Sequence, residues 1–291
     1  PTPSPTNNNP QLVTGEAEPG SRIDVYVNTT LQQSVYADAD TGSYSLQAYL
    51  LEGDNLIHTT ATNDAGTSVV SDEISVVFNL KDGGELSGSL ISNFTFEENT
   101  SYRITGGDFT IESGVTVDVQ PGARIEMPSY SYLIVQGALN VAGSENNPAV
   151  FTSSEPLGFK SEGDWNGIQV DNGGSFNLSH ATVEYGFFGI WIVDGGSGSV
   201  VNSLLHSNSF GISVFHGGSI SVFDSLITNN STGVEIKGQT NSYIGPGNTI
   251  VSNRIGIILD THYDYDNYIS YIPAATITGN YIYDNQYNVL S

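Results

Sequence analysis

The sequence predicts an all-β chain with two modules, a small β-sandwich followed by a right-handed parallel β-helix with coils of about 22 residues. The composition is rich in Gly, Ser, Thr, Asn and β-branched residues, which suit strands and turns better than helices. Short alternating segments fill the first part, and a glycine-led motif then repeats at a nearly constant interval. We expect a Pro/Thr/Asn-rich linker or tail at 1–9, the sandwich at 10–80, a linker at 81–86 and the β-helix at 87–291.

The charge balance excludes several classes of partner. The 291 residues include 7 Lys and Arg against 31 Asp and Glu, a formal net charge of −24, although only 13% of the residues are charged. Binding to nucleic acid or to an anionic membrane surface needs basic clusters that so few cations do not supply. No apolar run reaches the ~18 residues of a membrane span, and the chain has no Cys. We expect a secreted or cell-surface protein, with neither nucleic acid nor direct membrane insertion.

Residues 10–80 read as short strands separated by turns. Residues 22–27 alternate polar and apolar side chains, and turn signals occur at 19–20, 38–42, 52–55 and 63–66. This spacing of strands and turns is typical of a β-sandwich. The segment from TGEAEPGSRIDVYVN through GDNLIHTTATNDAGTSVVSDEISVVF resembles the bacterial immunoglobulin-like repeats of large surface proteins. The resemblance implies a spacer or stalk, without catalytic chemistry.

The second module is predicted from its repeats. Glycines at 167, 189, 211, 233 and 256 each begin a strand-like segment, at spacings of 22, 22, 22 and 23 residues. Two apolar columns follow them and are expected to point inward: Ile168, Ile190, Ile212, Val234 and Ile257, then Val170, Ile192, Val214, Ile236 and Leu259. An asparagine recurs before the glycine strands, at Asn208, Asn230, Asn253 and Asn280, and predicts a stacked amide ladder.

The segments upstream of these repeats carry a family resemblance. Residues 109–127, 132–153 and 163–168 resemble the entry coils of secreted right-handed β-helix proteins. That family includes polysaccharide lyases, hydrolases, epimerases, adhesins and phage fibres. The resemblance therefore implies a fold and an extracellular setting, but no single function.

One group of charges on the glycine-led strands could carry catalysis. Glu235, Lys237 and Asp260 are expected on the outward face of neighbouring coils. A lyase needs a base such as Lys237 together with cations, and a hydrolase needs two carboxylates roughly 5–10 Å apart. We favour a solvated surface with an ordinary ion pair instead, because the chain has few cations and its net charge repels polyuronates.

Outward aromatic side chains form a second candidate site. Trp191, Phe215, Phe223 and Val193 are expected on exposed columns, where an apolar patch would bind a partner or stack on sugar rings. The alternative is that the first module, or the loop at 154–166, covers this patch.

Calcium is the one candidate cofactor, and otherwise none is expected. Asp260, Asp264 and Asp266 lie in an insertion in the last coil, at a density of oxygen ligands that suits Ca²⁺. A solvated acidic loop explains the same residues. A further polar column, His180, Asn202 and Asp224, is expected to make hydrogen bonds at a corner.

The sequence favours a non-catalytic extracellular structural or adhesive module, such as a surface-fibre subunit or adhesin segment. Its expected partners are further copies of itself or other surface protein subunits. The alternative is a carbohydrate-active enzyme, a polysaccharide lyase or glycoside hydrolase, or a carbohydrate-binding module, with a polysaccharide on the glycine-led sheet. Ice binding is disfavoured, because the outward columns contain no Thr-x-Thr ladder.

Overall fold

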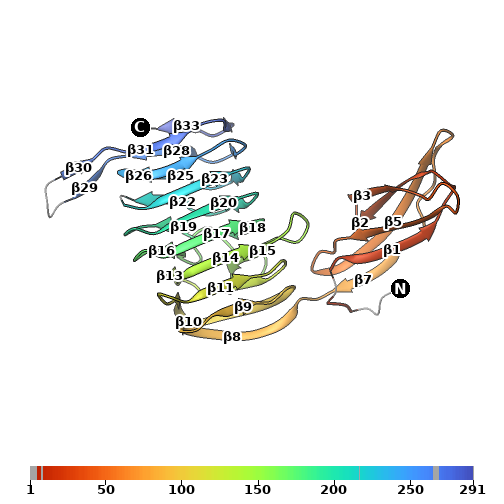
Figure 1. Cartoon of the computed structure of the whole chain (residues 1–291), viewed down its shortest axis with the longest axis horizontal. Coiled ribbons are helices and arrows are strands. Elements are labelled where there is room, and N and C mark those ends of the chain that lie inside the picture. Colours follow the sequence, from red (N-terminus) through yellow and green to blue (C-terminus); the bar gives the residue numbers. More distant parts are fainter. Residues whose placement is uncertain (1–4, 8, 216, 265–268, 291) are drawn as a thin grey trace. The chain divides into compact units, whose positions relative to one another are not determined.

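The computed structural model describes residues 5–7, 9–215, 217–264 and 269–290 (Figure 1). The chain divides into two compact units, residues 1–81 and 82–291. The elements of the described ranges are all β-strands. None of these ranges contains a helix long and apolar enough to cross a membrane.

The first unit consists of two antiparallel sheets around a shared core. β1 (Gln11–Glu16) pairs with β4 (Ser43–Ala48). The other sheet has the order β3–β2–β5–β6, with β7 also paired to β5; its strands are β2 (Arg22–Val27), β3 (Thr30–Tyr36), β5 (Gly53–Asn63), β6 (Gly66–Thr67) and β7 (Ile74–Phe78). Ile23, Val25, Leu46, Ile57 and Phe78 are buried between the sheets. The alternation at 22–27 is thus a strand with one face in the core.

The described part of the N-terminal segment lies against the first unit. Thr6 forms an isolated bridge with Phe78. The side-chain amide of Asn9 donates to the Leu50 carbonyl at 3.0 Å and accepts from the Leu50 amide at 2.8 Å. The Thr6 bridge is parallel, and the Asn9 contacts are made by its side chain.

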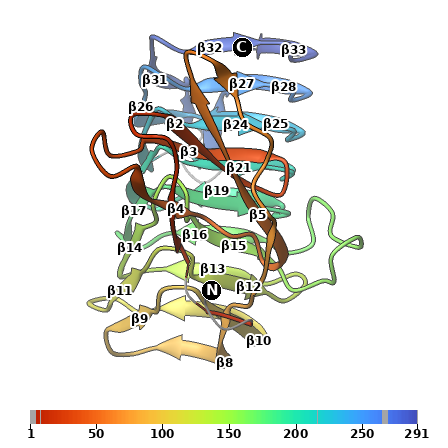
Figure 2. The ribbon, with the colours of Figure 1, turned by 90° about the vertical axis from the view of Figure 1, so that its right-hand side faces the viewer.

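The second unit is the predicted right-handed parallel β-solenoid, and its coils stack along one axis (Figures 1 and 2). One sheet has eight strands: β9 (Phe94–Phe96), β11 (Thr116–Val119), β14 (Ala138–Ala142), β17 (Ser175–Ser179), β20 (Ser197–Val201), β23 (Ser219–Phe223), β26 (Gln239–Ile244) and β31 (Ala274–Ile277). Most of the remaining strands form two rows, which the long strand β10 (Thr100–Ile111) joins into one sixteen-stranded sheet that also includes β8 (Lys81–Leu90).

We call the first of these rows the glycine-led row. It contains β13 (Tyr132–Val135), β16 (Gly167–Val170), β19 (Phe188–Ile192), β22 (Phe210–Phe215), β25 (Thr232–Lys237), β28 (Ile255–Asp260) and β33 (Tyr287–Leu290). The second row contains β12 (Arg124–Met127), β15 (Ala149–Ser153), β18 (Ala181–Glu184), β21 (Leu204–His206), β24 (Leu226–Thr228), β27 (Thr249–Val251) and β32 (Tyr281–Tyr283). Neighbouring strands within each row are parallel, and residues paired between two such strands lie one coil apart.

The repeated glycine is explained by close stacking of the coils. A Cβ atom on Gly189, Gly211 or Gly233 would lie 2.5, 2.6 or 2.6 Å from the carbonyl oxygen of the glycine in the next coil. Any larger residue would therefore push the coils apart. The two apolar columns that follow this glycine point inward as predicted, and Ile168, Ile190, Ile212, Val234 and Ile257 are fully buried.

The predicted asparagine ladder is present, with one different member. The amide Nδ2 of Asn208 donates to Asn230 Oδ1 at 3.2 Å, and the same bond recurs from Asn230 to Asn253 and from Asn253 to Asn285 at 3.0 Å. Asn285 takes the place expected for Asn280, because the last step of the ladder spans 32 residues instead of 22 or 23. Asn280 instead accepts from Asn248 at 2.9 Å.

The start of the solenoid differs from the expected boundary. Residues 81–86, expected as a linker, are the first part of β8 (Lys81–Leu90), which pairs with β10. Leu86 and Leu90 pack against the solenoid core. β8 thereby supplies backbone partners and apolar cover to the first coil. A last pair, β29 (His262–Asp264) and β30 (Ile269–Tyr271), forms a hairpin in the final coil.

Candidate functional site

In the structure, two residues of the predicted catalytic trio pair with one another, and the third bonds to a residue of another strand. Lys237 Nζ lies 3.8 Å from Asp260 Oδ2 on the neighbouring strand, and 5.3 Å from the centre of the Phe215 ring. Glu235 Oε2 accepts a hydrogen bond from Ser213 Oγ at 2.5 Å. Lys237 and Asp260 thus form a surface ion pair, and Glu235 is turned to the preceding coil.

The predicted aromatic residues lie on two different sheets. Trp191 and Phe215 are in edge-to-face contact on the glycine-led row, with ring centres 5.8 Å apart. Phe188 stacks on Trp191 at 5.0 Å, so the rings cover one another. Phe223 belongs to the eight-stranded sheet, where its ring lies 5.5 Å from that of Tyr243. Val193 is 9% exposed and offers little surface.

The predicted calcium ligands are only partly described. Asp260 lies at the end of β28, where its Oδ1 accepts from the Thr261 amide at 2.8 Å. Asp264 ends β29, and Asp266 lies outside the described residues. Within the described ranges, no group of three or more His, Asp and Glu side chains is arranged to hold a metal ion.

A charged column on the outward face of the second row was not predicted from the sequence. Arg103, Glu126, Thr152, Glu184 and His206 occupy successive outward positions on β10, β12, β15, β18 and β21. Thr152 Oγ1 donates to Glu184 Oε1 at 2.8 Å, and His206 Nε2 lies 3.0 Å from Glu184 Oε2. Thr152, Glu184 and His206 thus form one connected polar network across three coils.

Two further cations join this column. Arg124 Nε lies 3.1 Å from Glu126 Oε1, and Arg103 Nη2 lies 3.5 Å from Glu126 Oε2. Lys160 Nζ donates to Thr152 Oγ1 at 3.0 Å. The residues from 82 onward contain only five Lys and Arg, so three of the five lie in or beside this column. We call the seven residues the charged cluster: Arg103, Arg124, Glu126, Thr152, Lys160, Glu184 and His206.

Lys160 reaches the cluster on the loop at 154–166, which leaves the solenoid after β15 (Figure 2). Trp165 is fully buried, and its Nε1 donates to the Glu184 carbonyl at 2.9 Å. Farther out on the loop, Glu162 accepts from Ser231 at 3.2 Å. The loop is thus fixed beside the second row and forms a wall along the carboxyl ends of its strands. None of these three contacts of the loop involves Trp191, which the loop was expected to cover.

The surroundings shift the pKa values of two groups in the cluster. Burial lowers the pKa of Lys160, and the nearby Arg124 guanidinium lowers it further. Burial acts to raise the pKa of Glu184, but hydrogen bonds from His206 and Thr152 outweigh it, so that pKa is lowered. The cluster therefore combines an ionised carboxylate with an amine that loses its proton more readily than an ordinary lysine.

A groove of about 790 Å³ borders the cluster. It runs along the corner between the eight-stranded sheet and the second row, over four coils. Its lining includes Glu145, Pro148, His180, Thr182, Asn202, Leu204, Asp224 and Leu226. His180, Asn202 and Asp224 have φ values of 50°, 49° and 46°, the left-handed conformation that turns the chain at each corner. The polar column predicted at this corner thus forms one side of a groove.

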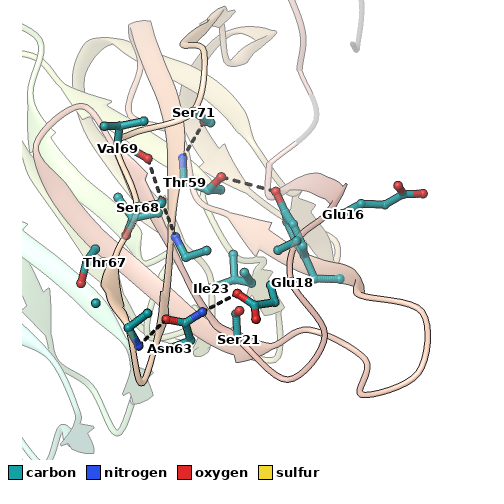
Figure 3. Close-up of a pocket in the computed structure, with 16 residues that line it drawn as sticks. Glu16, Glu18, Ser21, Ile23, Thr59, Asn63, Thr67, Ser68, Val69 and Ser71 are labelled. Atoms are coloured by element: carbon teal, nitrogen blue, oxygen red, sulfur yellow. Dashed lines mark hydrogen bonds between the residues drawn. The ribbon is translucent and has the colours of Figure 1, made fainter.

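The first unit contains a second hollow, of about 530 Å³ (Figure 3). Its polar side chains largely bond within the hollow. Asn63 Nδ2 donates to Glu18, and the hydroxyls of Ser68 and Ser71 accept from the amides of Ala61 and Thr59 at 3.0 Å. Glu16 and Glu18 are the charged residues in its lining. Without a cation or histidine there, this hollow lacks the acid–base pairs of the charged cluster.

The spacing of the cluster explains why sequence reasoning missed it. Glu184 and His206 are 22 residues apart, like the other repeats, but Thr152 and Glu184 are separated by 32 residues. The loop that supplies Lys160 lies in this interval, so the cluster shows no constant period. The available signal was that three of five cations fall between residues 103 and 160.

The comparison with protein families agrees with the solenoid. Residues 88–201 match the model of the pectate-lyase like beta helix domain. No curated protein matches the sequence. Among solved structures, a family 28 exopolygalacturonase of Yersinia enterocolitica is similar with a TM-score of 0.40 and 11% identity, over 94% of this chain and 74% of that one.

Two pectate lyase structures are also similar. One, from Erwinia chrysanthemi in complex with tetragalacturonic acid, has a TM-score of 0.36 and 10% identity, over 97% of this chain and 99% of that one. The other, from Pectobacterium carotovorum, has a TM-score of 0.32 and 10% identity, over 96% of each chain. Scores and identities this low do not bear on function. The family match covers all members of the charged cluster except His206, and residues 88–201 of this chain are similar to a pectate-lyase-like beta-helix domain.

Proposed function

We propose that this chain acts on an acidic polysaccharide at the charged cluster, by eliminating a glycosidic bond next to a sugar carboxylate. The observation that carries the proposal is the gathering of three of the second unit's five cations at one place, in a chain with a net charge of −24. One of the three is a lysine whose pKa is lowered by burial and by Arg124. Fixed cations beside a readily deprotonated amine suit this chemistry.

The arginines supply the electrostatic part of the reaction. Arg103 and Arg124 both contact Glu126 and hold it between them. A sugar carboxylate that binds beside them gains the same neutralisation, which makes the hydrogen on the adjacent carbon more acidic. The guanidinium geometry also suits bidentate contact with a carboxylate.

Lys160 supplies the base. Its neutral Nζ takes the proton from the carbon next to the carboxylate, and that electron pair forms a carbon–carbon double bond in the ring. The bond from the following ring carbon to the glycosidic oxygen breaks, and this oxygen takes a proton from water. The products are a shortened chain and an unsaturated acidic sugar end. The lowered pKa of Lys160 increases the neutral fraction that can act.

Hydrolysis by a pair of carboxylates has less support at this site. A general acid must keep its proton near neutral pH, which requires a raised carboxyl pKa. The pKa of Glu184 is instead lowered, through its bonds from His206 and Thr152. We assign Glu184 to positioning, because Thr152 lies between it and Lys160 and donates to it while accepting from Lys160.

The family match supports a role connected with polysaccharide. Six of the seven members of the charged cluster lie in the matched range, 88–201. The match favours a carbohydrate-active protein over the adhesin or fibre subunit that the sequence suggested. Self-association likewise has no support, and a polysaccharide is the better candidate partner. The acting surface proposed here is the second row, in place of the glycine-led sheet.

Two further expectations from the sequence, the fold of the first unit and the location of the protein, form part of the same proposal. The first unit has the paired antiparallel sheets of a sandwich, and we assign it an immunoglobulin-like fold that serves as a spacer. The acidic composition and the absence of Cys fit a secreted or cell-surface location.

The test is a cleavage assay on the full chain with a panel of acidic polysaccharides, following the ultraviolet absorbance of the unsaturated product. We expect product from at least one polymer. Lys160→Gln should reduce the rate at least 100-fold, and Lys160→Arg should not restore it, because arginine keeps the charge but does not act as the base. Release of saturated ends alone would contradict elimination, and full activity of Lys160→Gln would contradict the assigned base.

A further inference from the structure

The groove beside the charged cluster differs from it in charge, and this difference bears on the ligand. We propose that the groove is a subsite for an uncharged sugar unit, so that the polysaccharide carries a neutral sugar next to the acidic one. The inference rests on the proposed function and specifies its substrate class. It is carried by the position of the groove, the chemistry of its floor and the sign of its charges.

The groove and the cluster share the same strands. Thr182 and Leu204 line the groove, and each stands two residues before a cluster member, Glu184 and His206 respectively. Side chains two residues apart on a strand point to the same face, about 7 Å from one another. A polymer held at the cluster therefore places its neighbouring unit in the groove.

The floor of the groove is apolar. Leu204, Leu226 and Pro148 line it, and Leu226 is 39% exposed although it is a large aliphatic side chain. Sugar rings present faces of C–H groups that pack on such surfaces. The volume of about 790 Å³ falls within the ~300–1,000 Å³ range of small-ligand sites.

The rim of the groove carries hydrogen-bonding groups and negative charge. His180 and Asn202 offer polar side chains that suit sugar hydroxyls. Glu145 and Asp224 are both exposed and are the acidic residues of the lining. None of the described residues that line the groove is Lys or Arg.

These charges discriminate against an acidic sugar in the groove. A carboxylate there would meet Glu145 and Asp224 with no cation to neutralise it, and like charges repel. The neighbouring cluster instead has three fixed cations, Arg103, Arg124 and Lys160, against two carboxylates, Glu126 and Glu184. Two adjacent positions on one face thus select for different charges. A polymer composed only of uronic acid satisfies the cluster but not the groove.

The inference is tested by calorimetric titration of the full chain with two sets of oligosaccharides of equal length. One set contains only uronic acid units, and the other alternates uronic acid with a neutral hexose. We expect the alternating set to bind at least tenfold more tightly. Equal affinity, or a preference for the all-uronate set, would overturn the inference and leave the proposed function standing.

Charge variants identify the groove as the source of this preference. The double variant Glu145→Gln/Asp224→Asn removes the repulsion, so the affinity for the all-uronate oligomers should rise at least fivefold. The affinity for the alternating oligomers should change less than twofold. Asp194→Asn is the matched control, because Asp194 is also an exposed corner residue, with a φ of 47°, and lies outside the groove lining. An equal gain in the control would contradict a local effect. If neither set binds, both the inference and the proposed function fail.

Discussion

The two rows of strands in the solenoid have the same kind of interior and very different exteriors. In the glycine-led row, Ile190, Ile212 and Val234 are fully buried, and in the second row Val183, Leu205 and Ile227 are as well. Outside, the glycine-led row presents aromatic rings that pack on one another and one ion pair. The second row presents the charged cluster and the adjoining groove.

The difference shows that stacking constrains only one side of each strand. An inward side chain must fit the coils above and below it, so its type recurs at each turn. An outward side chain has no such requirement, and its identity is free to serve a ligand. The fold therefore leaves a periodic trace in the sequence, and the site does not.

The largest effect on stability is expected where the loop wall joins the second row. Trp165→Ala removes a fully buried side chain and its bond to the Glu184 carbonyl. We expect a loss of about 3–5 kcal/mol in the free energy of unfolding. Trp191→Ala on the glycine-led row should cost less than half as much, because Trp191 is only partly buried. Denaturant unfolding followed by circular dichroism measures both, and equal losses would contradict the comparison.

The next largest loss of stability is expected when a buried amide of the asparagine ladder is removed, compared with removal of an exposed amide. Asn230→Ala leaves the carbonyls of Leu205 and Thr228 without their donor and removes the contact to Asn253. We expect a loss of about 1–3 kcal/mol in the free energy of unfolding. The exposed Asn177, which stacks on Asn140 in the eight-stranded sheet, should cost about 0.5 kcal/mol or less when changed to Ala. Thermal melting of both variants would show a larger shift for Asn177→Ala if this ranking is wrong.

The reaction rate should depend on pH in a direction set by Lys160. Its pKa lies below the ordinary value of 10.5, and only the neutral amine accepts a proton. Activity should therefore rise with pH as Lys160 is deprotonated, with the midpoint of the rise below pH 10.5. Rates measured across this range would contradict the assignment if activity fell as pH increased from neutral.

The smallest effect is expected in the acid stability of the cluster. The pKa of Glu184 in the folded protein is lower than the ordinary glutamate value of 4.5. Its ionised form therefore stabilises the folded state above the unfolded pKa, and this contribution is lost as pH falls through the folded pKa. Glu184→Gln should reduce the dependence of the melting temperature on pH in this acidic range. Glu235→Gln on the glycine-led row is the control, and an equal reduction there would show that the effect is not specific.

The same contrast explains how much the sequence could predict. The spacing of the glycines predicted the solenoid because each one meets a carbonyl oxygen of the next coil. The asparagine ladder followed from its period up to Asn253, and its last member was misplaced because the final coil is longer. Lys160 and Thr152 could not be joined to Glu184 by period, since the loop at 154–166 interrupts the count. The trio at Glu235, Lys237 and Asp260 was visible because those strands keep a regular register.

The most direct test of the central claim compares two lysines on the two rows. Lys160→Gln and Lys237→Gln remove the same charge, one from the charged cluster and the other from the ion pair with Asp260. Binding of an acidic polysaccharide to the full chain should weaken at least tenfold in Lys160→Gln and less than twofold in Lys237→Gln. The reverse order would place the polysaccharide on the glycine-led row and contradict the site proposed on the second row.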